Sequence, residues 1–197
     1  MFRSNFIWPL LFLFFCSTIP VARSQEVQIR TPYVASPPDI VNAMLKLAGA
    51  GKSDVIYDLG CGDGRIVITA AKEYGARGVG IDINPQRIDE ANQNAKREHV
   101  ANLVNFRIGD VFESDVRQAS IVALYMLPDV NLKLRPKLQN ELKPGSRIVT
   151  HGFAMGNWQP TKVEEVDGEK IYLWVLPAGK KLSAALEPVL FKRSLFD

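Results

Sequence analysis

The chain has 197 residues, of which 47% are apolar and 23% are charged, a composition typical of a globular domain that buries a sizeable core. The formal net charge of +3 comes largely from the first 24 residues, which hold two arginines and no acid; the remainder carries 22 basic and 21 acidic residues. This near balance lacks the basic excess of a nucleic-acid-binding surface, so we expect no nucleic acid partner.

The first 24 residues have the features of an export signal. A weakly positive start leads into an apolar run over residues 6–15, and small residues precede Gln25. The run is shorter than the roughly 20 residues that a membrane-spanning helix needs. We expect a signal peptide over residues 1–24, with an uncleaved membrane anchor through residues 6–21 or a misassigned start codon as alternatives. The protein would then be periplasmic or membrane-attached, although a cytosolic location stays open.

From residue 31 onward, strand and helix signals alternate along the chain. A proline-rich segment leads into a helix that Ser36 can cap, with Pro37 in the first turn. Further helices are predicted at 64–74, 84–99 and 129–142, and buried strands at 54–60, 77–83, 103–110, 120–127 and 146–153. Pro136 is expected to kink or break the last helix. Residues 162–176 predict a hairpin that turns at Asp167-Gly168.

This alternation predicts one α/β domain over residues 31–197, a three-layer sandwich around a mainly parallel, twisted sheet. The closing hairpin adds antiparallel strands at one edge of the sheet. In Rossmann-like sheets of this kind, ligands bind at the carboxyl ends of the strands, near the point where the strand order reverses.

A glycine-rich turn follows the first predicted strand. Gly60, Gly62 and Gly64 form G-x-G-x-G, which differs from the dinucleotide fingerprint G-x-G-x-x-G, and no Gly-Lys-Ser/Thr phosphate loop is present. Asp58 and Asp63 should repel a pyrophosphate but attract a cation. S-adenosylmethionine carries a sulfonium and an α-ammonium and no phosphate, so it fits this turn. Glycines let the backbone lie against such a ligand with positive φ.

Acidic residues also end the next two predicted strands. Asp82 lies 22 residues after Gly60, where a carboxylate can accept hydrogen bonds from both ribose hydroxyls. Asp110 can accept from the adenine amino group, with Val111 or Phe112 beside the base. Each acid alone could be an ordinary residue of a strand-end turn. Three acids at the ends of three successive strands favour a cofactor site.

The motifs DLGCGDGR, GVGIDI and GDVF resemble those of class I S-adenosylmethionine-dependent methyltransferases. The segments PYVASPPDIVNAMLKLA, ALYMLPDVNLKLRPKL and PGSRIVTHGFAMGNW narrow the likeness, which covers residues 31–160. They resemble the small protein-lysine methyltransferases that include the mitochondrial enzymes acting on the ATP synthase c-ring protein and the ADP/ATP carrier. The resemblance implies S-adenosylmethionine as the cofactor and a cofactor site formed by Tyr33, Asp58, Gly60, Gly62, Gly64, Asp82, Ile83, Asp110 and Val111.

The acceptor side of the site is less marked. Many methyltransferases acting on amide or base nitrogens carry Asn/Asp-Pro-Pro-aromatic after the fourth strand, whereas this strand ends in LYMLPD, which argues against those acceptors. Tyr125, Asp129, His151 and Trp158 should lie at strand tips, where aromatic faces can hold an amine. Core packing is the simpler role for His151 and Trp158. We expect Tyr125 to act in catalysis, through geometry and cation contact rather than as a base.

The expected reaction is in-line displacement of the methyl group by a nitrogen lone pair. A lysine amine has a free pKa of about 10.4, which burial beside a sulfonium lowers, so no dedicated base is required. His99 and His151 are far apart and lack partners at ligand spacing, so we expect no metal. We predict methylation of lysine in a protein, with membrane proteins among the candidates. A methyltransferase for a small molecule or lipid-linked acceptor, and a non-catalytic cofactor-binding protein, are the alternatives.

Overall fold

The computed structural model describes residues 33–177. The predicted signal peptide or anchor over residues 1–24 lies outside this range. Among the helices between residues 33 and 177, none has the length and apolar character needed to cross a membrane.

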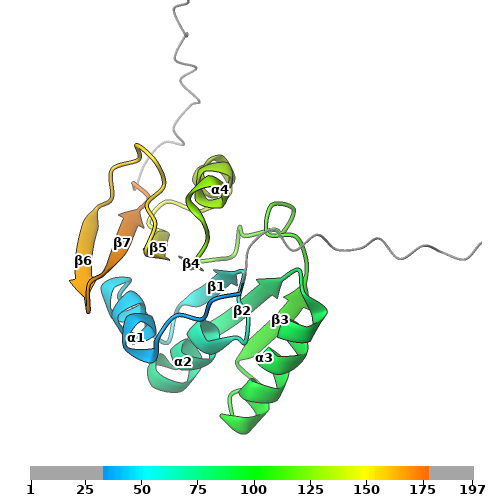
Figure 1. Ribbon diagram of the computed structural model, residues 1–197. Helices are drawn as coiled ribbons and strands as arrows, with labels where there is room; N and C mark the ends of the chain where they lie inside the picture. Colours follow the sequence, from blue (N-terminus) through cyan, green and yellow to red (C-terminus); the bar gives the residue numbers. More distant parts are fainter. Residues whose placement is uncertain (1–32, 178–197) are drawn as a thin grey trace, which may run out of the picture.

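A seven-stranded sheet forms the middle layer of the fold (Figure 1). Its strands are β1 (Val55–Leu59), β2 (Arg77–Asp82), β3 (Val104–Ile108), β4 (Ile121–Leu124), β5 (Arg147–His151), β6 (Lys162–Val166) and β7 (Glu169–Val175). They lie in the order β3-β2-β1-β4-β5-β7-β6. The pairs from β3 through β5 are parallel, and β7 runs antiparallel to both β5 and β6. The structure confirms the predicted sheet, and its strand order reverses between β1 and β4.

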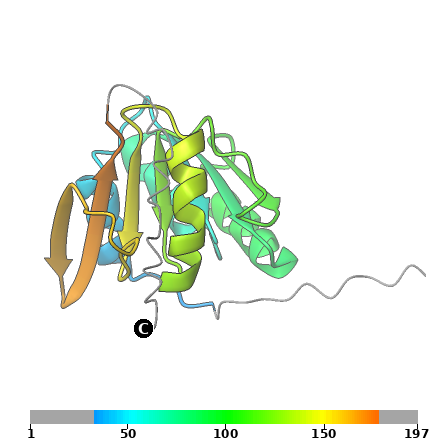
Figure 2. The same cartoon turned by 90° about the horizontal axis from the view of Figure 1, so that it is seen from above.

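Helices cover both faces of the sheet. They are α1 (Pro38–Leu47), α2 (Arg65–Tyr74), α3 (Pro85–Arg97) and α4 (Pro128–Glu141). Figures 1 and 2 show α1, α2 and α3 on one face and α4 on the other. Apolar side chains of α1 and α2 pack on β1, β4 and β5 from one side, and those of α4 pack on the same strands from the other. The three-layer sandwich is therefore confirmed.

Of the two effects expected of Pro136, a kink or a break, the structure of helix α4 contradicts the break. The helix runs without interruption to Glu141. Pro136 lies on the exposed side, while Leu134 and Leu138 on either side of it are fully buried against the sheet. Burying two leucine side chains stabilises the helix by about 3–6 kcal/mol, which offsets the roughly 3 kcal/mol cost of an interior proline.

The two ends of the α/β domain show one correction and one confirmation. Pro37, not Ser36, is the N-cap of α1, and no side chain caps that helix. The Ser36 hydroxyl instead pairs with Nδ1 of His151 at 2.9 Å. The β6–β7 hairpin turns at Asp167 and Gly168 as predicted, and both adopt positive φ (51° and 81°), as a two-residue type I′ turn requires.

Candidate cofactor and acceptor site

The glycine turn lies at the carboxyl end of β1 and is tied to the neighbouring strand. Gly60, Gly62 and Gly64 have φ of 84°, 53° and 81°, a region that side chains with Cβ rarely adopt. The amides of Gly60 and Cys61 both donate to the carbonyl oxygen of Ile81, at 2.8 and 3.0 Å. The turn is thereby held against the end of β2, where the predicted ribose-binding carboxylate lies.

Asp82 is fixed by two backbone amides at the end of β2. Its Oδ2 accepts from the Gly62 amide and its Oδ1 from the Asn84 amide, each at 2.9 Å. The side chain of Asn84 in turn caps α3 by accepting from the Gln86 amide. A carboxylate has about four acceptor positions, so two amides leave free positions on Asp82. Asp82 is half-buried and can still accept hydrogen bonds from two ribose hydroxyls.

Asp58 is the most perturbed carboxyl group of the site. It is 2% exposed, and burial together with the negative charges of Asp82 and Asp63 raises its pKa to about 8. No donor in residues 33–177 forms a hydrogen bond that offsets this effect. A buried acid without a partner is costly, and a cation placed beside it relieves that cost. The site therefore fits a ligand with an ammonium group, such as S-adenosylmethionine.

Asp63 has a different role from the one predicted. Its carboxylate forms an ion pair with Arg65 at 2.6 Å, and Arg65 also donates to the carbonyl oxygen of Ser36 at 2.9 Å. Asp63 thus has a partner for its charge within the protein, although it still contributes to raising the pKa of Asp58. The pair ties the glycine turn to the segment before α1. Attraction of a cationic ligand rests on Asp58 and Asp82. Arg65 stands where the dinucleotide fingerprint has its third glycine, and its ion pair with Asp63 was not predicted from the sequence.

Tyr33 lies across the glycine turn. A Cβ atom on Gly62 would approach its ring to 2.3 Å, and the Arg87 guanidinium carbon lies 4.5 Å from the ring centroid. This arrangement places the segment before α1 over the predicted cofactor site. Sequence reasoning missed Arg87, because no pattern in α3 points to Tyr33, more than 50 residues earlier.

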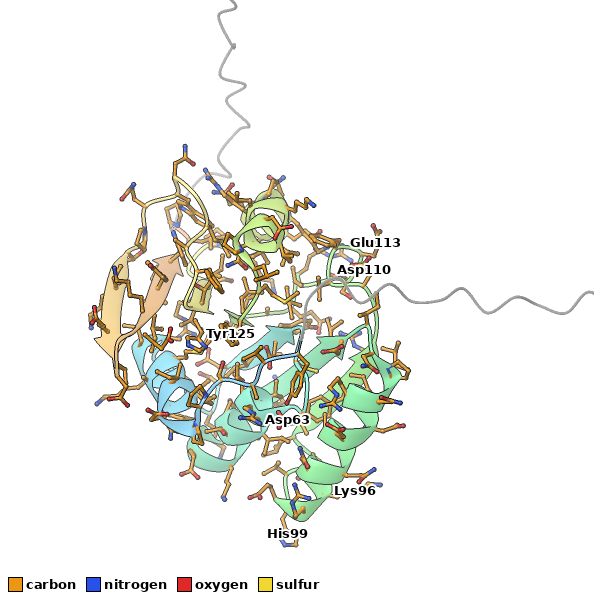
Figure 3. The ribbon with its side chains drawn as sticks, in the orientation of Figure 1. Asp63, Lys96, His99, Asp110, Glu113 and Tyr125 are labelled. Carbon is orange, nitrogen blue, oxygen red and sulfur yellow. The ribbon has the colours of Figure 1, made fainter. Side chains whose placement is uncertain are left out.

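The predicted adenine-binding residues lie at the far end of the same edge. Asp110 is exposed, and its Oδ1 accepts from the Phe112 amide at 2.8 Å, while Val111 is buried and Ile83 is half-buried. Figure 3 shows Asp110 and Glu113 beyond the end of β3, with Tyr125 farther along the edge. The position of Asp110 suits contact with a base, and that contact stays a prediction.

Tyr125 follows β4 and stacks on a buried histidine. Its ring centroid lies 3.9 Å from that of His151, with 27° between the planes, and Phe153 stacks at 6.4 Å. His151 is 1% exposed, and burial lowers its pKa, which keeps the ring neutral near pH 7. His151 therefore supports the ring of Tyr125 from within the protein and ties it to Ser36.

Two other candidates do not join this stack. Trp158 packs on Trp174 with ring centroids 5.7 Å apart, and the Trp174 indole donates to the carbonyl oxygen of Trp158 at 3.0 Å. Trp158 thus serves packing, the simpler role that its sequence position allowed. Asp129 is exposed in the first turn of α4, where its carboxylate lies 4.0 Å from the Lys133 amine.

Several known proteins are similar to this chain in sequence. The family model of the ANTKMT methyltransferase domain matches residues 58–162. A protein-lysine N-methyltransferase of Saccharolobus islandicus is 42% identical over 150 residues, which are 74% of this chain and 93% of that protein. An adenine nucleotide translocase lysine N-methyltransferase of Mus musculus is 30% identical over 185 residues, which are 93% of this chain and 77% of that protein.

A solved crystal structure has a similar fold. The crystal structure of an RNA methyltransferase from Salinibacter ruber in complex with S-adenosyl-L-homocysteine superposes with a TM-score of 0.73. That protein is 49% identical, over 76% of this chain and 98% of its own.

Proposed function

Because the chain belongs to the ANTKMT methyltransferase domain family and is an S-adenosylmethionine-dependent methyltransferase, we propose that it methylates the ε-amine of lysine in a protein. The relatives from Saccharolobus islandicus and Mus musculus are lysine methyltransferases by name, and this supports the proposal. The observation that carries it is the stack of Tyr125 on neutral His151. Tyr125 follows β4, which lies beside β1, the strand that contains Asp58. An aromatic face there suits an amine beside a sulfonium.

The cofactor site acts by binding and orientation. S-adenosylmethionine supplies an electrophilic methyl group on a sulfonium. Asp58, once ionised, would balance the α-ammonium of this ligand, and Asp82 would accept from the ribose hydroxyls. The Asp82 carboxylate is held by the Gly62 and Asn84 amides, so its orientation is set before the ligand arrives. Such preorganisation lowers the entropic cost of positioning the methyl group.

The acceptor amine must arrive with a free lone pair. Lysine has a pKa of about 10.4 in water, and transfer into a buried site next to a positive charge lowers it, so the proton leaves to solvent. Tyr125 would orient the amine through its ring face, which requires no ionisation of the phenol. The reaction therefore needs no general base from the chain.

RNA is the second candidate acceptor, because the neighbour from Salinibacter ruber is an RNA methyltransferase by name. The balanced charge of residues 25–197 and the sequence LYMLPD, which begins with the last residue of β4, argue against it. A small-molecule or lipid-linked acceptor is the third candidate.

One experiment separates these acceptors. The full chain is incubated with methyl-labelled S-adenosylmethionine in four separate reactions, which contain the protein, RNA, lipid or small-molecule fraction of its own cells. Labelled methyl-lysine in hydrolysed protein supports the proposal. Label confined to RNA, or to lipid or small molecules, contradicts it and selects the corresponding alternative.

We also propose that residues 1–24 direct export or attach the protein to a membrane. This rests on the apolar run and the small residues before Gln25. N-terminal sequencing of the protein from its own cells should begin at Gln25, or the intact chain should sediment with membranes. A cytosolic protein that retains Met1 would contradict both outcomes.

A further inference from the structure

Three carboxylates gather at the acceptor end of the site. Asp167 and Glu169 belong to the β6–β7 turn and the start of β7, and Asp39 lies in the first turn of α1. The Gly152 amide donates to the Lys170 carbonyl at 2.7 Å, which fixes the turn next to the carboxyl end of β5. The three acids therefore lie on the same edge of the sheet as the predicted acceptor position. We refer to Asp39, Asp167 and Glu169 as the acidic rim.

The charges of the acidic rim are not balanced within the described protein. A hydrogen bond between Asp39 and Asp167, which forms when one of the two carboxyl groups carries a proton, raises the pKa of Asp167 and lowers that of Asp39. None of the three acids forms an ion pair with a lysine or arginine among residues 33–177. Both aspartates and Glu169 are solvent-accessible, so the rim presents an uncompensated negative surface near neutral pH.

A buried ring nitrogen of His151 lies beside the acidic rim. His151 is 1% exposed and its Nδ1 is paired with the Ser36 hydroxyl, but its Nε2 has no hydrogen-bond partner. The nearest carboxylate oxygen, Oε2 of Glu169, lies 3.7 Å away, beyond hydrogen-bond reach. A buried polar group without a partner is unfavourable. In the tautomer in which the Ser36 hydroxyl donates to Nδ1, Nε2 carries the hydrogen, and an acceptor brought there by a ligand would satisfy it. The carbonyl oxygen of a bound peptide is such an acceptor.

We propose that the acidic rim docks a basic side chain close to the acceptor lysine of the protein substrate, an inference that rests on the proposed lysine methylation. Charge complementarity favours a cationic peptide and disfavours the phosphates of RNA. No group of three or more His, Cys, Asp or Glu within the described part of the chain is arranged to hold a metal ion. A lysine or arginine side chain is therefore the cation that fits.

The strand order sets the distance between the acceptor lysine and the basic residue that docks on the acidic rim. The start of β7 lies two strands from the tip of β4, where Tyr125 follows. Two spacings of about 4.8 Å give roughly 10 Å along the edge. An extended peptide covers this in about three residues at 3.3 Å each, and a helix in about seven at 1.5 Å each. The proposal therefore places arginine or lysine about three residues from the acceptor in an unfolded substrate.

The test compares peptides that differ in one charge. Each peptide carries a single lysine, with arginine or glutamine three residues before it in one pair and after it in a second pair. Binding to the full chain is measured by calorimetry with S-adenosyl-L-homocysteine present, and methylation by mass spectrometry. The enzymes are the wild type, Asp167→Asn/Glu169→Gln and Glu113→Gln. Asparagine tolerates the left-handed conformation of Asp167, so the turn should persist.

Glu113→Gln is the control for removing an acid elsewhere on the same edge of the sheet. Glu113 is an exposed acid at the β3 end of the edge, far from Tyr125 in Figure 3, and its substitution removes one negative charge there. In the wild type and this control, the arginine peptide of at least one pair should have a Kd and a KM about 2- to 30-fold lower than those of its glutamine counterpart. This is the range that two exposed ion pairs give. This advantage should vanish in the double variant and shrink with added salt, while kcat stays the same.

The outcomes separate the two proposals. The acidic-rim proposal is overturned if the arginine and glutamine peptides of both pairs bind with equal Kd. It is also overturned if the arginine peptides still bind more tightly to the double variant. Lysine methylation then stands if the peptides are modified. Peptides that bind in the expected order without being methylated support the rim and contradict lysine transfer to such substrates.

Discussion

Asp58→Asn should stabilise the ligand-free protein near neutral pH while removing most of its cofactor affinity. Burial and the charges of Asp82 and Asp63 raise the pKa of Asp58 from 3.8 to about 8. The native state therefore binds this proton more tightly than the unfolded chain does. The contribution of Asp58 to stability is present in full below pH ~4 and is lost progressively as the pH rises toward 8.

The magnitude follows from this difference in pKa. Each pKa unit corresponds to about 1.4 kcal/mol, so at pH 7.5 the carboxyl group of Asp58 costs the ligand-free fold about 5 kcal/mol. Asparagine does not ionise, but its buried amide costs about 1–3 kcal/mol where it lacks partners. The net gain is about 2–4 kcal/mol, or roughly 4–16 °C in Tm for a domain of this size.

The assay is thermal unfolding at pH 5, 6.5 and 8 without ligand, followed by calorimetry with S-adenosyl-L-homocysteine. The gain in Tm of Asp58→Asn over the wild type should grow with pH, and the affinity should fall by about 10- to 150-fold, as for the loss of hydrogen bonds to a charged group. Asp110→Asn is the control, because Asp110 is exposed and its substitution should leave the pH dependence of Tm unchanged. A Tm difference that stays constant from pH 5 to 8 would refute the electrostatic reasoning, and unchanged affinity would remove Asp58 from the ammonium site.

Three further predictions concern the cofactor and the acceptor. Asp82→Ala should weaken binding of S-adenosyl-L-homocysteine by about 1–3 kcal/mol in calorimetry, and unchanged affinity would exclude Asp82 from the site. Tyr125→Ala should lose most methyl transfer while Tyr125→Phe keeps much of it, because the ring stacked on His151 positions the acceptor amine. If Tyr125→Ala is as active as the wild type, the acceptor pocket lies elsewhere. The rate of lysine methylation at saturating cofactor should rise with pH from 7 to 9 as the amine loses its proton. If the single-turnover rate does not change over this pH range, attack by the deprotonated amine does not limit the rate.

The sequence alone predicted the sheet, the glycine turn and the position of Asp82. These features depend on local patterns: apolar runs of strand length, glycines that adopt positive φ, and an acid at a strand end. Parallel strands bring their carboxyl ends to one edge, so residues distant in the sequence could be assigned to one site without coordinates. The β6–β7 turn was also predictable, because Asp-Gly favours the conformation that a two-residue turn needs.

Only the tertiary structure decided which side chains pair across the site. Arg65 forms an ion pair with Asp63, and Tyr33 covers the glycine turn. Ser36 forms a hydrogen bond with His151 instead of capping α1. Ser36 and His151 are 115 positions apart, and no local propensity encodes such a contact. The same holds for helix α4, whose burial against the sheet outweighs the proline within it. Local sequence patterns set the elements and their ends, whereas long-range packing and the competition among charges for partners set the chemistry at the edge of the sheet.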